Sequence, residues 1–236
     1  MINLDRLVGY DTETTGVNVH SDDTRIVTAA FVLKTPDGLK DIELEMNPGI
    51  DIPTGASDVH GITTEKAQGF MPYLEGLTRM KQFLDWTLYE EIPIVAYNGA
   101  YDITLTRVEF ERHGIPLDWD SLILLDPLVM DRHLDPFRKG GRKLGRVAEL
   151  YGYDLSNAHN ATADVEATLH IIERMLPKFV NKIEEKFGTK PETAKDFMEI
   201  QTVLYMNQMT DLERYFRKSD PSKTINKSWP FQNPEE

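Results

Sequence analysis

Residues 11–16 read Asp-Thr-Glu-Thr-Thr-Gly, and this stretch constrains the chain more than any other part of the sequence. It follows an apolar run at residues 7–10, which predicts a buried strand. Side chains two residues apart in a strand point to the same face, about 7 Å from one another, so Asp11 and Glu13 should aim at one spot. Neighbouring carboxylates repel, which raises the pKa of each unless a cation lies between them. Oxygen ligands of this kind suit Mg²⁺ or Mn²⁺, although a single such pair is also an ordinary feature of an acidic strand end.

The length and composition limit the class of protein. The chain has 236 residues, enough for one large domain with a full core, and it contains no cysteine. The lack of cysteine excludes disulfides, thiolate zinc sites and a cysteine nucleophile, and it fits a reducing compartment. The sequence shows no signal-peptide pattern and no apolar run near the ~18 residues of a membrane helix. We therefore expect a cytoplasmic protein with no membrane partner.

The charge distribution is uneven. The net charge of −13 disfavours broad binding to duplex nucleic acid, because that binding depends on lysine and arginine. It still allows an enzyme that meets a few phosphates through metal ions. A glycine-containing loop at residues 135–143 is basic in contrast, and it carries Arg138, Lys139, Arg142 and Lys143. A cationic rim would guide a polyanion, so we predict that these four residues contact phosphates; the alternative is solvated charge on a surface loop.

The order of the predicted elements indicates an α/β fold. Strands are expected at residues 5–11, 24–33 and 39–46, and a Thr-Pro-Asp-Gly turn signal at 35–38 joins the last two. These strands should form an antiparallel meander. Two further strands, at 94–97 and 122–125, alternate with helices, which predicts a mixed five-stranded sheet flanked by helices. Ligands usually bind at strand ends in such sheets, and the carboxylates gather there.

We divide the chain into two parts. The first is one domain over residues 1–185. The second, residues 186–236, holds an amphipathic helix that opens at Pro191 and an irregular tail that contains three more prolines. The helix either covers the core of the domain or docks a partner.

Three further motifs follow the first one in the chain. They are His60-Gly61-Ile62-Thr63, Asn98-x-x-Tyr101-Asp102 and His159-x-Ala161-x-x-Asp164. Each is weak alone, but the four together, in this order and in their predicted strand and helix contexts, resemble the DnaQ-like 3′–5′ exonucleases of the DEDDh subgroup. The resemblance covers roughly residues 5–180. The family often has His where Tyr97 stands and Phe where Tyr101 stands, and neither departure touches a carboxylate.

The resemblance implies a ribonuclease-H-like fold and hydrolysis with two Mg²⁺ or Mn²⁺ ions. By the family pattern, Asp11, Glu13 and Asp164 hold the first ion. Asp11 is shared with the second ion, which Asp102 supports. Two such ions stabilise the attacking and leaving oxygens of a phosphodiester. His159 takes a proton from the attacking water, a task that suits a side chain with a pKa near ~6.5.

The resemblance also implies which residues meet the substrate. The segment at residues 60–63 resembles the family segment beside the 3′-terminal nucleotide, where Ile62 would pack on a base or sugar and either the backbone or Thr63 would meet the 3′-hydroxyl. The substrate-binding residues expected around the catalytic motifs are Thr12, Thr14, His60, Ile62, Thr63, Asn98 and Tyr101.

The expected activity is therefore a 3′–5′ exonuclease that releases nucleoside 5′-monophosphates from a free 3′-hydroxyl end, most simply of a single strand. It would serve in DNA proofreading or repair, in trans to a DNA polymerase partner. Two alternatives stay open. The enzyme could trim RNA, since discrimination rests on how the 2′-hydroxyl is met. The chain could instead be a catalytically idle module that binds a polymerase, although all four carboxylates and His159 are present.

Overall fold

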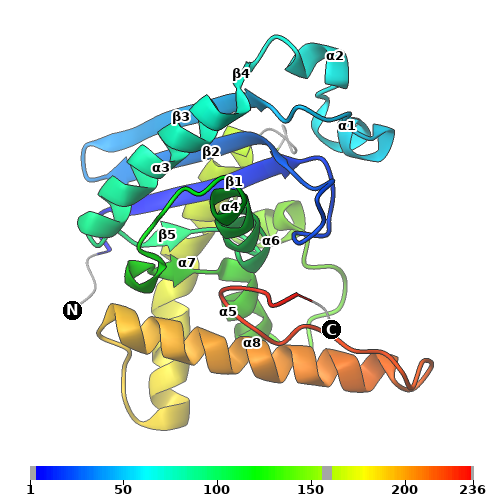
Figure 1. Ribbon diagram of the computed structural model, residues 1–236. Helices are drawn as coiled ribbons and strands as arrows, with labels where there is room; N and C mark the ends of the chain where they lie inside the picture. Colours follow the sequence, from blue (N-terminus) through cyan, green and yellow to red (C-terminus); the bar gives the residue numbers. More distant parts are fainter. Residues whose placement is uncertain (1–3, 156–160, 235–236) are drawn as a thin grey trace.

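The computed structural model describes residues 4–155 and 161–234. In this part of the chain a mixed sheet of six strands, in the order β4-β3-β2-β1-β5-β6, lies between layers of helices. Figure 1 shows the long helix α7 (Ala161–Phe187) behind the sheet, with α3 (Tyr73–Tyr89) and α4 (Ala100–Arg112) on the opposite face. The predicted α/β fold class is confirmed.

The first three strands form the predicted antiparallel meander. They are β1 (Leu7–Thr14), β2 (Ile26–Thr35) and β3 (Gly38–Asn47). Strand β1 continues past the predicted end, so that Asp11 pairs with Ala30 and Glu13 with Thr28 before the register shifts at Thr14. The side chains of Asp11 and Glu13 therefore project from a backbone that pairing with β2 holds in place.

The sheet has one strand more than the five expected. Strands β5 (Ile94–Val95) and β6 (Leu124–Leu125) add parallel to β1, as the fold class requires. The additional strand is β4 (Met71–Pro72), which pairs in parallel with the end of β3 at the edge of the sheet. A two-residue strand carries no alternation that a sequence could reveal, and proline is tolerated there because an edge strand needs no second ladder partner.

The remaining helices are short, apart from one. Among the described residues they are α1 (Thr54–His60), α2 (Thr64–Ala67), α5 (Pro127–Leu134), α6 (Leu144–Leu150) and α8 (Ala194–Phe216), with a 3-10 turn at Trp119–Ser121. No helix in the described ranges combines the length and apolarity that a bilayer crossing requires.

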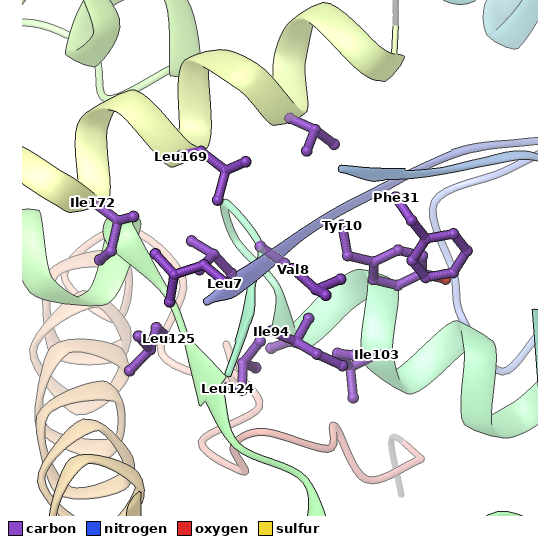
Figure 2. Close-up of a cluster of buried hydrophobic side chains, with 14 of the residues drawn as sticks. Leu7, Val8, Tyr10, Phe31, Ile94, Ile103, Leu124, Leu125, Leu169 and Ile172 are labelled. Carbon is purple, nitrogen blue, oxygen red and sulfur yellow. The ribbon is translucent and has the colours of Figure 1, made fainter. Parts of the chain in front are cut away.

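Strand β1 is buried on both faces, and its glycine lets a helix approach closely. A Cβ atom built at Gly9 would lie 2.3 Å from Cγ1 of Val165 and 3.0 Å from Cγ of Leu169, both in α7. On the other face, the Tyr10 ring stacks on Phe31 at 4.7 Å between centroids. Figure 2 shows Leu169 meeting β1 from one side and Ile103 of α4 from the other. Strand β1 is thus fixed between two helices.

The C-terminal helix belongs to the same core. Phe197, Leu204, Tyr205 and Met209 of α8 are buried in the cluster that contains the sheet residues, and Trp229 of the tail joins them. Figure 1 shows α8 lying across the end of the domain, beside α5. The boundary placed after residue 185 falls in the last turn of α7.

Candidate active site

Three carboxylates converge where β1 meets the start of α7. Asp11 and Glu13 lie two residues apart on the face of β1 that packs against α7, and Asp164 lies in the first turn of that helix. One oxygen of each carboxylate lies within 4.8 Å of one oxygen of each of the others. Val165, which directly follows Asp164, packs closely on Gly9, so the start of α7 lies against β1. The arrangement suits a divalent cation bound through oxygen.

The electrostatics of the three carboxylates also favour a cation. Burial raises the pKa of Asp11 well above its usual range, and the charges of Asp102, Glu13 and Asp164 raise it further. Burial raises the pKa of Glu13 to about 7, with the charge of Asp164 as the next cause. Without a cation these groups would take up protons near neutral pH, whereas a divalent ion between them would keep them ionised.

Asp102 reaches the same strand end from the other face of the sheet. It lies in the first turn of α4 and is 4% exposed. Its Oδ1 accepts hydrogen bonds from the backbone N–H of Thr12 at 3.1 Å and from the Thr12 hydroxyl at 2.6 Å. Burial raises the pKa of Asp102 to about 7, and the bonds from Thr12 oppose that rise. Asp102 lies outside the three-carboxylate cluster, yet its charge contributes to the raised pKa of Asp11.

Two of the predicted substrate-binding residues close the turn after β1. The Tyr101 hydroxyl lies 2.7 Å from the Thr14 hydroxyl, and both hydroxyls lie within hydrogen-bonding distance of the carbonyl oxygen of Gly16. Tyr101, the residue before Asp102, therefore ties α4 to the strand end a second time. The role of Thr12, Thr14 and Tyr101 in binding substrate stays a prediction.

The turn before α4 depends on a carboxylate that the sequence analysis missed. Asn98 has the left-handed backbone conformation, with φ of 62°, and Gly99 follows it as the N-cap of α4. Asp126 accepts the backbone N–H of Asn98 at 3.0 Å and that of Gly99 at 3.1 Å. The signal was available, because Asp126 follows a predicted strand and precedes a proline, as an N-cap does.

The segment at residues 60–63 lies beside the end of β1. Burial lowers the pKa of His60, and the backbone of Thr14 opposes this shift, which places the imidazole next to the strand end. Thr63 accepts a hydrogen bond from the backbone N–H of Lys66 and so caps α2. Ile62 is 5% exposed and packs with Val27 in a small separate cluster. These contacts position the segment, and its contact with a nucleotide stays a prediction.

The basic loop is attached at the same end of the sheet. The hydroxyl of Tyr97, two residues after β5, donates to the carbonyl oxygen of Arg142. The guanidinium of Arg138 bonds both oxygens of the buried Asp131, at 2.7 and 2.6 Å, and Arg142 pairs with the same carboxylate. Lys139 and Lys143 are exposed, and no ion pair of theirs is found within residues 4–155 and 161–234. Two of the four predicted phosphate ligands are thus engaged by Asp131, and two are available to a polyanion.

The predicted general base belongs to the motif that ends at Asp164. His159 falls outside the described residues, which resume at Ala161. Ala161 is buried at the start of α7, three residues before Asp164. The helix therefore carries the last predicted carboxylate into the cluster, while the histidine of the same motif stays a prediction.

Comparison with known proteins agrees with this geometry. The exonuclease family RNase_T matches residues 8–172. DNA polymerase III PolC-type of Streptococcus sanguinis is 29% identical over 182 residues, which cover 77% of this chain and 12% of that protein. The PolC-type enzyme of Streptococcus pneumoniae strain D39 is 25% identical over 229 residues, which cover 92% of this chain and 15% of that protein. The chain thus spans only a small part of the length of these relatives.

Solved structures share the fold. A structure of exonuclease I superposes with a TM-score of 0.62 at 20% identity, over 77% of this chain and 43% of that one. Escherichia coli exonuclease I in complex with a dA16 oligonucleotide gives the same TM-score at 19% identity, over 76% and 43%. The family match spans more than half of the sequence, including the first, second and third motifs and Asp164, and the fold agrees with it. The chain therefore belongs to the DnaQ-like exonuclease family.

Proposed function

We propose that this protein is a divalent-metal-dependent exonuclease that removes nucleotides one at a time from the 3′ end of single-stranded DNA. The observation that carries the proposal is the cluster of Asp11, Glu13 and Asp164 within 4.8 Å, with Asp102 held beside it by Thr12. Four carboxylates at one strand end repel one another, which makes the site costly in the absence of a cation. Membership of the exonuclease family indicates that a cation bound there would serve phosphodiester hydrolysis.

The residues present fit two Mg²⁺ or Mn²⁺ ions. Asp11, Glu13 and Asp164 would hold one ion, and Asp102 would hold the second together with Asp11. Bound ions would stabilise the negative charge that develops on the attacking and leaving oxygens of a phosphodiester. Thr12 keeps Asp102 in place and favours its ionised form, since it donates two hydrogen bonds to one carboxylate oxygen.

The proton of the attacking water would pass to His159, which the family motif places five residues before Asp164. A histidine is suited to this because its pKa lies near the working pH. The products are nucleoside 5′-monophosphates, because the attacking water joins the phosphorus and the 3′ oxygen leaves. The reaction needs no covalent enzyme intermediate, because water itself attacks the phosphorus as the 3′ oxygen leaves.

DNA is favoured over RNA by the relatives. The polymerase relatives are named for DNA synthesis, and the exonuclease I neighbour holds a DNA oligonucleotide. Both relatives are named as DNA polymerases, so we propose that the activity proofreads for a DNA polymerase. Lys139 and Lys143 would meet phosphates of the same strand.

The test is a nuclease assay on matched single strands. A 5′-labelled DNA strand with a 3′-hydroxyl should shorten in single-nucleotide steps with Mg²⁺ and stay intact with EDTA. The same strand with a 3′-phosphate should resist, and a circular strand should stay uncut. Asp11→Ala should abolish the activity while the fold is kept.

Other outcomes separate the alternatives. Faster loss of a matched RNA strand would assign the enzyme to RNA trimming. Cutting of the circle would mean an endonuclease, and no cleavage of any substrate with Mg²⁺ or Mn²⁺ would leave an idle binding module. Wild-type activity in Asp11→Ala would refute the assignment of the metal site.

A further inference from the structure

The edge of the sheet nearest to the site is closed by one side chain of the C-terminal helix. Strand β6 lies at the edge of the sheet, so one side of its backbone has no strand neighbour. Gln201 of α8 fills that place, because its Nε2 donates to the carbonyl oxygen of Leu124 and its Oε1 accepts the N–H of Asp126, each at 2.8 Å. Its amide thus bonds the same pair of backbone groups that a neighbouring strand would bond. Gln201 is fully buried.

The residue fixed in this way organises the turn before α4. Asp126 is 1% exposed, and its carboxylate accepts three backbone N–H groups, those of Asn98, Gly99 and Leu128, at 3.0, 3.1 and 2.9 Å. Asn98 has a positive φ, a conformation that asparagine adopts more readily than most residues other than glycine, and the bonds to Asp126 hold the turn in it. Gln201 orients the backbone at Asp126, and Asp126 in turn holds this conformation.

The turn leads directly to a carboxylate of the site. The carbonyl oxygen of Asn98 accepts the N–H of Tyr101 at 3.1 Å, and that of Gly99 accepts the N–H of Ile103 at 3.0 Å. These are the first bonds of α4, and they bracket Asp102. A rotation of the turn would therefore rotate Asp102 against Thr12 and the three-carboxylate cluster.

We propose that Gln201 is a positioning residue of the nuclease site, acting through Asp126 and the Asn98–Gly99 turn on Asp102. The inference rests on the proposed function. It assigns a role to α8, which begins after the family match ends at residue 172. The C-terminal helix would then be part of the catalytic unit and more than a cover for the core.

A matched pair of variants tests the proposal. Gln201→Met removes the amide that bonds Leu124 and Asp126. Gln208→Met makes the same change two turns along α8, where the amide donates to the carbonyl oxygen of Val129 at 2.9 Å. Gln201→Met loses two hydrogen bonds between α8 and the rest of the domain and Gln208→Met loses one, so both should lower the urea midpoint of unfolding.

The readout that separates positioning from stability is the metal requirement. We expect Gln201→Met to raise the Mn²⁺ concentration for half-maximal turnover and to lower kcat. The product of the two fold-changes should be about ten- to hundredfold, as for a displacement of up to ~1 Å. Gln208→Met should keep the wild-type values. Mn²⁺ affinity, measured by calorimetry without substrate, should weaken in the first variant alone.

Equal metal requirement and equal kcat in the two variants would refute the positioning role. Should Gln201→Met fail to fold, Asp126→Asn carries the same test, because it keeps the side-chain volume while an amide replaces an acceptor oxygen of the turn. Wild-type Mn²⁺ affinity in a folded Asp126→Asn would also refute it. A wild-type protein that binds Mn²⁺ but degrades no nucleic acid would instead refute the proposed function. The Mn²⁺ affinities of Gln201→Met and Gln208→Met would still test the positioning role of Gln201.

Discussion

Replacing Gly9 by alanine should push α7 away from β1 and carry Asp164 out of the carboxylate cluster. The new Cβ would lie 2.3 Å from Cγ1 of Val165 and 3.0 Å from Cγ of Leu169. Ordinary contacts between carbon atoms are about 3.5–4.0 Å, so the clash with Val165 requires a movement of more than ~1 Å. Valine has one preferred rotamer in a helix, and Val165 is fully buried, so its side chain cannot turn away. The helix itself must shift.

The shift has two consequences of different size. Overpacking a dense core costs about 1–3 kcal/mol of the free energy of unfolding. Asp164 precedes Val165 and moves with it, while Asp11 and Glu13 stay in the paired strand. Because Mg²⁺ demands near-octahedral oxygen ligands at about 2.0–2.1 Å, a displacement near 1 Å should weaken its binding and lower kcat by roughly 10²-fold.

The assay compares urea unfolding with single-strand degradation over a range of Mg²⁺ concentrations. Gly145→Ala is the matched control, since a Cβ built at Gly145 in α6 would meet no atom within 4 Å outside its own helix and chain neighbours, so alanine there should not lower the stability. The double variant Gly9→Ala/Val165→Ala removes the clashing methyl and should regain metal affinity. If Gly9→Ala lost stability but kept the wild-type Mg²⁺ requirement, the approach of α7 would not be what places Asp164.

Three further predictions concern charge. The pKa values of Glu13 and Asp102 are raised to about 7 in the folded protein. In EDTA the urea midpoint of unfolding should therefore fall as the pH rises from about 4 to 7, and it should fall less in Asp102→Asn. A steeper fall after Mg²⁺ is added would contradict this. Replacing Lys139 and Lys143 by alanine should flatten the slope of log affinity for single strands against log salt by about 0.7 for each lost phosphate contact, and an unchanged slope would return both to solvated loop charges. His159→Ala should lower turnover by roughly 10²–10⁴-fold, while binding with Ca²⁺ in place of Mg²⁺ survives; an equal loss of binding would make His159 a residue that positions the substrate.

Local patterns in the sequence determined much of the site. The period of two in a strand was sufficient to place Asp11 and Glu13 on one face, and both residues pair with β2 in regular register. The meander followed from alternation and one turn signal, since neighbouring strands joined by a tight turn pair in antiparallel fashion. Asp102 was predicted to open a helix after a strand, and it lies in the first turn of α4. Each of these inferences depends on residues close together in the chain.

The tertiary structure decided what depends on residues far apart. The role of Gly9 is set by Val165, more than 150 positions away, and no local pattern marks a glycine as a contact for a helix. The basic loop illustrates the same point, because Asp131 binds Arg138 and Arg142 and leaves Lys139 and Lys143 as the exposed cations. Such pairings form only when the chain has folded.

The C-terminal helix shows most clearly where prediction from the sequence alone stops. Its amphipathic pattern predicted a buried face, but it could not distinguish packing on the core from docking a partner. The contact of Gln201 with Leu124 and Asp126 settled that α8 packs on the edge of the sheet. A buried amide is compatible with many partners, and only the position of an unpaired strand edge determines which backbone groups it bonds. The sequence therefore predicted which carboxylates belong to the candidate site, and the fold decided which distant residues contact the elements that carry them.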